Sequence, residues 1–168
     1  GLVLKVLSDL CPLTSDPMTL LFVYGTLKRG QPNHHRLLDP AHGSAVFVAP
    51  ALTVQRFPLI IATEYNIPFL LNLPGDGNRI HGELYRIDAS MLEFLDDFEG
   101  VPARYQRHPV ELEVTGAGSE GLKVGGRMEA FIYTTTTFKP EWPALQRFES
   151  YDADGDHGLK YCYPEDRH

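Results

Sequence analysis

Four carboxylates of this sequence could carry acid–base chemistry. Asp96, Asp97 and Glu99 stand at the end of a predicted helix, and Glu83 stands in the predicted strand before it. Neighbouring carboxylates can raise one another's pKa toward neutrality, where a carboxyl group can both accept and release a proton. An acid at the carboxyl end of a helix also opposes the helix dipole, and a residue that breaks a local rule is a candidate for a function. Because acidic side chains are usually solvated, a plain surface position for each of the four stays open on the pattern alone.

A backbone turn that follows an apolar run is the second candidate feature. Leu20–Val23 is typical of a buried strand, and it stops at Tyr24-Gly25. Gly25 lets a ligand approach the main chain without meeting a Cβ atom, and a glycine-containing bend can aim successive backbone N–H groups at one point. We interpret Tyr24, Gly25, Thr26 and Leu27 as the floor of a small-molecule site, and an ordinary tight turn is the alternative.

Motifs for metal, nucleotide and serine-hydrolase chemistry are incomplete in this sequence. Asp152-Ala-Asp-Gly-Asp156 is similar to the start of a calcium loop, but His157 and Tyr163 replace the glycine and the glutamate that such a loop requires. The histidines of segment 34–42 lack zinc-ligand spacing. Gly25–Lys28 lacks the Gly-Lys-Ser/Thr ending of a phosphate-binding loop, and no Gly-x-Ser-x-Gly motif occurs. We therefore expect no metal and no cofactor.

Composition narrows the class of protein further. The chain has 168 residues, which predicts that residues 18–168 form a single domain, and residues 1–17 are interpreted as an extension of no assigned role. The net charge of −7 argues against nucleic acid and anionic membrane as partners, since both call for basic patches. No apolar run approaches the length of a membrane span. Two cysteines, Cys11 and Cys162, make no disulfide framework, so a reducing cytoplasm is the expected location.

The elements that must position these groups are several short strands and one strong helix. Apolar residues recur at helical spacing over Ala89–Glu99, with Asp88 as the predicted N-cap and Gly100 as the predicted C-cap. A short helix is expected within 32–38, with Asn33 as its N-cap. Strands are predicted in segments 20–23, 43–55, 58–63, 68–73, 79–87, 110–114 and 127–134, and an irregular tail from residue 138. This pattern predicts an α+β fold.

Motifs along the rest of the chain accompany the turn in a fixed order. Tyr24-Gly-Thr-Leu27 with Lys28-Arg-Gly-Gln-Pro-Asn-His34 resembles the opening signature of the γ-glutamylcyclotransferase-like superfamily, and most of all its branch for γ-glutamylamines. The resemblance covers about Leu20 to Arg167. The further matching motifs are Asn66-Ile-Pro-Phe-Leu-Leu-Asn-Leu-Pro-Gly75, Leu95-Asp-Asp-Phe-Glu-Gly100, Pro102-Ala-Arg-Tyr-Gln-Arg107, Pro140-Glu-Trp142, Ser150-Tyr-Asp152 and His157-Gly-Leu-Lys-Tyr161.

The resemblance implies a fold, a reaction and roles for residues. The fold is a small mixed-strand β-barrel with flanking helices and a site at one mouth. Glu99 matches the acid–base glutamate of the family, and the Tyr24–Leu27 turn opens the matching signature. In the implied reaction the α-amine of a γ-glutamyl group attacks its own γ-carbonyl, which closes 5-oxoproline and releases the amine. The implied substrate is γ-glutamyl-ε-lysine from degraded transglutaminase cross-links, no cofactor is required, and a monomer is favoured.

Two other functions remain open at this point. The first is a cyclotransferase for γ-glutamyl-amino acids or glutathione, and the second is a non-catalytic ligand-binding module on the same barrel. For the isopeptide we expect a narrow apolar slot built by Asn66–Leu73 and Pro140–Tyr161, with no cation beside the scissile nitrogen. An inward-turned Arg104 or Arg107 would receive a carboxylate and would remove this discrimination against anionic leaving groups.

Overall fold

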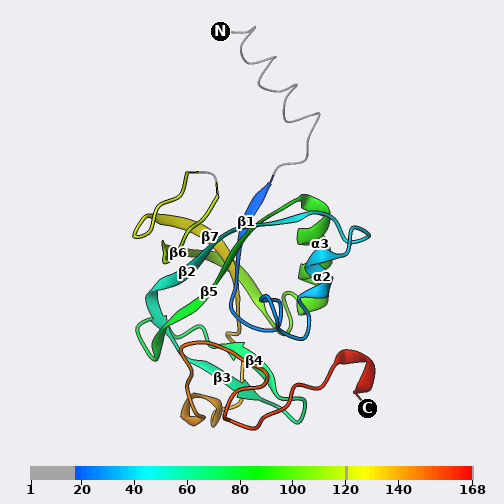
Figure 1. Cartoon of the computed structure of the whole chain (residues 1–168). Coiled ribbons are helices and arrows are strands. Elements are labelled where there is room, and N and C mark those ends of the chain that lie inside the picture. The colour runs from blue at the N-terminus through cyan, green and yellow to red at the C-terminus, as the bar shows by residue number, and fades with distance from the viewer. Residues whose placement is uncertain (1–17, 120, 168) are drawn as a thin grey trace, which may run out of the picture.

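The computed structural model describes residues 18–119 and 121–167, so the predicted extension 1–17, with Cys11, lies outside the described residues. Five strands close into a barrel in the order β1-β5-β2-β6-β7 (Figure 1). β1 and β7 pair in parallel and the other neighbours are antiparallel. The predicted mixed-strand barrel is therefore confirmed. The barrel strands are β1 (Thr19–Val23), β2 (Ala45–Phe57), β5 (Asn78–Ile87), β6 (Gln106–Val114) and β7 (Arg127–Thr134).

Strand β1 is apolar along most of its length because it is covered on both faces. Phe22 belongs to the core that fills the barrel, together with Leu84 of β5. Its neighbours on the opposite face, Leu21 and Val23, belong to a second core between the barrel and the helices. Successive side chains of a strand point to opposite faces, so a strand between two cores reads as a continuous apolar run.

Two helices lie beside the barrel: α2 (His35–Leu38) and α3 (Ala89–Glu99). Met91 and Leu95 of α3 are fully buried in the second core. The Asp88 side chain accepts a hydrogen bond of 2.9 Å from the Met91 N–H, and Gly100 closes the helix with φ of 71°. Both predicted caps of this helix are confirmed, and they fix Glu99 as its last residue.

The predicted N-cap of the short helix was wrong. His34 precedes α2, and no side chain caps its N-terminus. Asn33 is fully buried instead, and its side-chain amide donates to the Thr26 hydroxyl at 3.0 Å and to the Tyr161 hydroxyl at 2.8 Å. A fully buried amide with two polar partners joins segments that are far apart in the sequence, which a helix cap does not do.

A smaller sheet and the irregular tail stand at one end of the barrel (Figure 1). β3 (Leu59–Ala62) pairs with β4 (Ile67–Leu70) in an antiparallel hairpin. The tail contains only two short 3₁₀ turns, η1 (Trp142–Ala144) and η2 (Pro164–Asp166), within the described residues. Backbone hydrogen bonds fasten the tail, from the Phe148 N–H to the Leu59 carbonyl and from the Cys162 N–H to the Tyr65 carbonyl, both at 2.9 Å. The expected irregular wrap is thus present.

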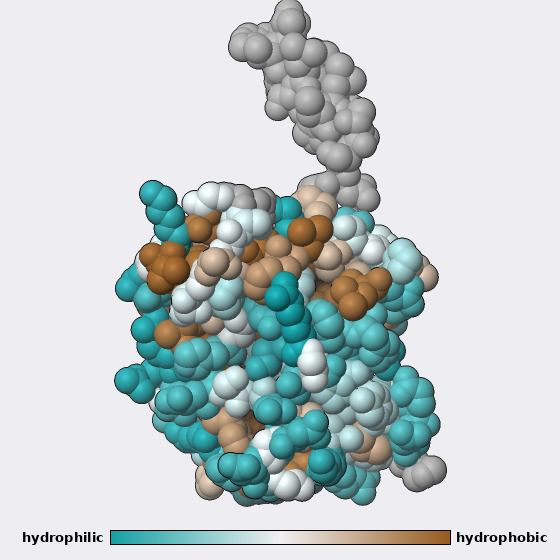
Figure 2. Space-filling view, viewed as in Figure 1, coloured by the Kyte–Doolittle hydropathy of each residue, from teal (hydrophilic) through white to brown (hydrophobic). Residues whose placement is uncertain are grey.

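The surface matches an acidic, mostly hydrophilic composition. On the face in Figure 2, hydrophilic residues predominate over the half that holds β3, β4 and the tail, and hydrophobic residues gather in separate groups over the barrel. Among the described residues, no helix is long and apolar enough to cross a membrane.

Candidate active site

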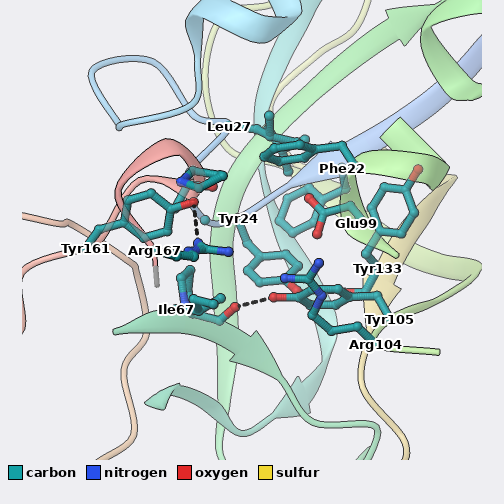
Figure 3. Close-up of a pocket in the computed structure, with 16 residues that line it drawn as sticks. Phe22, Tyr24, Leu27, Ile67, Glu99, Arg104, Tyr105, Tyr133, Tyr161 and Arg167 are labelled. Carbon is teal, nitrogen blue, oxygen red and sulfur yellow. Dashed lines mark hydrogen bonds between the residues drawn. The ribbon is translucent and has the colours of Figure 1, made fainter. Parts of the chain in front are cut away.

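A cavity of about 140 Å³ opens where β1 ends, between the barrel, the end of α3 and the tail (Figure 3). The Tyr24–Leu27 turn and Glu99, which were predicted to act together, both line it. β4, the segment after α3, β7 and the tail supply the other walls. The lining residues are Phe22, Val23, Tyr24, Gly25, Thr26, Leu27, Ile67, Pro68, Phe98, Glu99, Arg104, Tyr105, Tyr133, Tyr161, Pro164 and Arg167.

The turn on the cavity floor presents backbone donors that are not engaged. The Lys28 N–H donates to the Gly25 carbonyl at 3.2 Å, which closes a four-residue turn. None of the described residues accepts a hydrogen bond from the N–H groups of Gly25, Thr26 or Leu27. Asn33 braces the turn from behind, because its backbone N–H donates to the Thr26 carbonyl at 2.8 Å. Neighbouring amides of such a turn form a concavity that suits an anion or a developing oxyanion.

Gly25 also has a packing role in the cavity wall. Its φ is not positive, so the absence of a side chain matters here for space and not for backbone conformation. A Cβ atom on Gly25 would lie 3.1 Å from Cγ of Pro68 in β4. The glycine therefore lets the turn pack tightly against the opposite wall of the cavity, and a bulkier residue would push these two walls apart.

Glu99 has the perturbed carboxyl group of this cavity. Its side chain lies among Phe22, Tyr24 and Tyr133 (Figure 3). Burial raises the pKa of the Glu99 carboxyl group from 4.5 to about 7, and the positive charge of Arg104 opposes this rise. The residue as a whole is half-buried, and it contributes to the lining of the cavity. A carboxyl group with a pKa near neutrality can exchange a proton in both directions.

The tyrosines around Glu99 direct their hydroxyl groups elsewhere. Tyr24 donates to the Tyr133 carbonyl at 2.6 Å, Tyr105 to the Pro68 carbonyl at 2.7 Å, and Tyr133 to the Asp96 carboxylate at 2.7 Å. No hydrogen bond or ion pair joins the Glu99 carboxylate to another described residue. Burial and the charge of Glu99 raise the pKa of both Tyr24 and Tyr105 far above the usual value of 10. These phenols thus stay neutral and leave Glu99 as the titrating group.

The three rival carboxylates are occupied outside the cavity or exposed. Asp96 accepts two hydrogen bonds from Arg107, at 2.9 and 3.0 Å, besides the one from Tyr133. Asp97 is exposed. Glu83 accepts hydrogen bonds from the Arg29 N–H and the Tyr85 hydroxyl, both at 3.0 Å. None of the three lines the cavity, and no group of side chains suited to a metal occurs among the described residues.

Of the two arginines considered as inward cations, one does line the cavity, and a third arginine joins it. Arg104 and Arg167 both line the cavity, whereas Arg107 is turned away to Asp96. The Arg104 N–H donates to the Gly100 carbonyl at 2.8 Å, so the turn that ends α3 places Arg104 beside Glu99. The tail adds Tyr161, which belongs to the segment Pro140–Tyr161 predicted to build the site, and Arg167, which sequence reasoning missed. No local pattern points an irregular segment such as the one around Arg167 toward a distant barrel.

Comparison with known proteins gives one consistent answer. The chain matches the model of the family described as γ-glutamyl cyclotransferase, AIG2-like, over residues 21–153. It is 52% identical to γ-glutamylaminecyclotransferase B of Danio rerio over 150 residues, which cover 89% of this chain and 76% of the relative. It is 51% identical to γ-glutamylaminecyclotransferase of Homo sapiens over 153 residues, 89% of this chain and all of the relative.

Solved structures agree with these sequence matches. The crystal structure of an AIG2-like protein from Mus musculus superposes with a TM-score of 0.84 at 50% identity, covering 89% of this chain and 99% of that one. A structure described as γ-glutamyl cyclotransferase shares the fold, with a TM-score of 0.54 at 22% identity over 75% of this chain and 74% of that one. The match to the family model spans most of the sequence and includes both the turn and Glu99, so this chain belongs to the γ-glutamyl cyclotransferase, AIG2-like family.

Proposed function

We propose that this protein is a γ-glutamylamine cyclotransferase that converts γ-glutamyl-ε-lysine into 5-oxoproline and free lysine. The observation that carries the proposal is a single cavity in which a carboxyl group of pKa about 7, Glu99, lies with the unengaged amides of the Tyr24–Leu27 turn. The relatives named γ-glutamylaminecyclotransferase, at 51–52% identity over 89% of this chain, support the choice of an amine as the leaving group.

Glu99 is proposed as both the base and the acid of the reaction. The ionised carboxylate takes a proton from the α-ammonium group of the substrate, and the freed amine attacks the γ-carbonyl carbon within the same molecule. A carbon–nitrogen bond forms, and the carbonyl oxygen becomes an oxyanion. The protonated Glu99 then gives its proton to the departing nitrogen as the old carbon–nitrogen bond breaks. When the oxyanion restores the carbonyl group, the ring nitrogen still carries the second proton of the former ammonium group. The ionised Glu99 takes this proton and passes it to the released amine, which leaves as an ammonium group beside neutral 5-oxoproline. Both protons and all electron pairs are then accounted for without a further reactant.

The turn is proposed to stabilise the oxyanion. The N–H groups of Gly25, Thr26 and Leu27 are free to donate, and the loss of one such donor in other enzymes costs about 3–4 kcal/mol of transition-state stabilisation. Asn33 holds these amides in place from the buried side of the turn. The attacking amine and the γ-carbonyl belong to the same flexible γ-glutamyl group of the substrate. The cavity therefore contributes by holding this group in a bent conformation.

The test is a turnover assay that measures 5-oxoproline from γ-glutamyl-ε-lysine and from glutathione. We expect the isopeptide to be the better substrate, and Glu99→Gln to lower kcat by about a hundredfold or more. Glu93→Gln, which changes an exposed residue of the same helix, is the matched control and should keep wild-type kcat. Comparable kcat/KM for both substrates would leave a broader cyclotransferase. If neither the isopeptide nor glutathione yields 5-oxoproline, the protein is a ligand-binding module instead.

The cellular setting belongs to the same proposal. γ-Glutamyl-ε-lysine is the isopeptide left when transglutaminase cross-links are degraded, so the protein would act late in that breakdown. We further propose that it works as a monomer in a reducing cytoplasm, which the free thiol of Cys162 supports. Recovery of the active protein as a monomer after gel filtration, without added oxidant, is the corresponding measurement.

A further inference from the structure

A second cavity, of about 570 Å³, adjoins the first. The two cavities share Ile67, Arg104 and Arg167 as lining residues. Tyr65 and Trp142 add aromatic walls to the second cavity. A ligand whose γ-glutamyl end lies beside Glu99 would reach this wider space by passing these three side chains.

Three cations line this second cavity: Arg104 and Arg167, which it shares with the first cavity, and the exposed Lys139. Arg104 is exposed, and its guanidinium makes no hydrogen bond or ion pair with another described residue. Arg167 is held in place, because it donates to the Cys162 carbonyl and the Tyr161 hydroxyl, both at 3.1 Å, and lies 5.1 Å from the ring centre of Tyr65. The fixed guanidinium of Arg167 and the unpaired guanidinium of Arg104 each present a planar set of N–H donors to the same cavity. Such groups are suited to binding a carboxylate.

Negative and apolar groups complete the cavity. Glu64 of the β3–β4 hairpin and Glu141 of the tail add two negative charges to the lining of the cavity. Both side chains are exposed. The Trp142 ring packs against Phe69 with ring centres 4.7 Å apart, which fixes an apolar wall between the charged groups. The cavity thus combines cations, anions and an apolar wall, the three features that an amino acid with a long methylene stem requires.

We infer that this second cavity binds the α-amino acid end of the leaving amine: its carboxylate at Arg104, its ammonium group at the acidic residues, and its methylene stem along Ile67. The inference rests on the proposed function and specifies its substrate class, namely amines that carry a free amino acid group at the far end. In γ-glutamyl-ε-lysine that group lies roughly 6 Å from the scissile nitrogen, from bond lengths near 1.5 Å. The arginines thereby act on the far carboxylate of lysine and leave the scissile nitrogen among apolar groups.

Three substrates with the same stem test the inference. γ-Glutamyl-ε-lysine carries both charged groups, γ-glutamylcadaverine carries the ammonium group alone, and γ-glutamylpentylamine carries neither. We expect kcat/KM for the lysine compound to exceed that for the pentylamine by about tenfold or more, mainly through KM, since charge-assisted hydrogen bonds to a carboxylate are the strong ones. In Arg104→Gln the ratio of lysine to cadaverine compound should fall toward one, whereas Arg127→Gln, an exposed arginine on β7, should keep the wild-type ratio.

The outcomes separate the inference from the proposed function. Equal kcat/KM for all three substrates in the wild-type protein would overturn the inference and leave the cyclotransferase activity standing. An unchanged lysine-to-cadaverine ratio in Arg104→Gln would also overturn it, because the carboxylate would then be bound elsewhere. If none of the three yields 5-oxoproline, the proposed function fails and the inference fails with it.

Discussion

The perturbed carboxyl group of Glu99 predicts a measurable link between pH and stability. An ordinary glutamate in the unfolded chain has a pKa of 4.5, and burial raises the folded-state value to about 7. Between these values the unfolded chain releases the proton and the folded protein keeps it, so stability decreases as the pH rises through this window. Glu99→Gln removes this titration. The variant should therefore gain stability relative to the wild-type protein as the pH rises from 4.5 to about 7.

The size of this effect follows from the interval between the two pKa values. At about 1.4 kcal/mol for each pH unit, the interval from 4.5 to about 7 corresponds to about 3 kcal/mol. Because the carboxyl group faces an open cavity, solvent screening should reduce this to roughly 2 kcal/mol. The stability of Glu99→Gln relative to wild type should thus increase by that amount between about pH 4 and about pH 8.

Urea unfolding at several pH values, followed by circular dichroism, measures the difference directly. Glu93→Gln serves as the control, since Glu93 is exposed on the same helix and should follow the wild-type pH dependence. Parallel curves for wild type and Glu99→Gln across the window would refute the reasoning, because they would mean that Glu99 titrates at its ordinary pKa. The proposed proton cycling would then lose its physical basis.

Three further predictions concern the same site. The kcat/KM profile should rise with pH and level off above about pH 7, since the base form of Glu99 is required, and a flat profile from about pH 5 to 8 would contradict this. Gly25→Val should raise KM and lower kcat by about tenfold or more, because the added side chain collides with Pro68. Circular dichroism should still show a folded barrel, and unchanged kinetics would mean that the turn has only a structural role. Asn33→Ala should lower the free energy of unfolding by about 2 kcal/mol in urea titrations, because it leaves buried polar partners unsatisfied, and a loss well below about 1 kcal/mol would count against its bracing role.

Local patterns were sufficient to predict the strand that ends at Val23 and the helix that ends at Glu99. The apolar run Leu20–Val23 is bounded by a glycine turn, and Ala89–Glu99 has helical periodicity with a cap at each end. The burial of Glu99 could not be predicted in this way. It arises because Tyr105 and Tyr133 approach from later parts of the chain, and pairing across a barrel is decided by tertiary packing rather than by the residues next to Glu99.

The errors share the same cause. Asn33 was interpreted as a helix cap because asparagine favours that position, but its partner Tyr161 lies 128 residues later. The direction of Arg104 was left open, because it depends on the turn that follows Gly100. Contacts that span the whole chain leave no periodic signal, so the direction of Arg104 and the place of Arg167 appear only in three dimensions.

The seam of the barrel has a consequence for how the protein acquires its site. β1 and β7, the first and last barrel strands in the sequence, meet through the pair Leu21 and Phe131, and Tyr24 reaches across to the Tyr133 carbonyl just beyond. Such distant pairing closes a long loop, which is slow compared with forming local structure. Because β7 supplies Tyr133 to the cavity wall and the carbonyl that holds the Tyr24 hydroxyl, the cavity is complete only when this seam is closed. Loss of activity during unfolding should therefore coincide with opening of this seam.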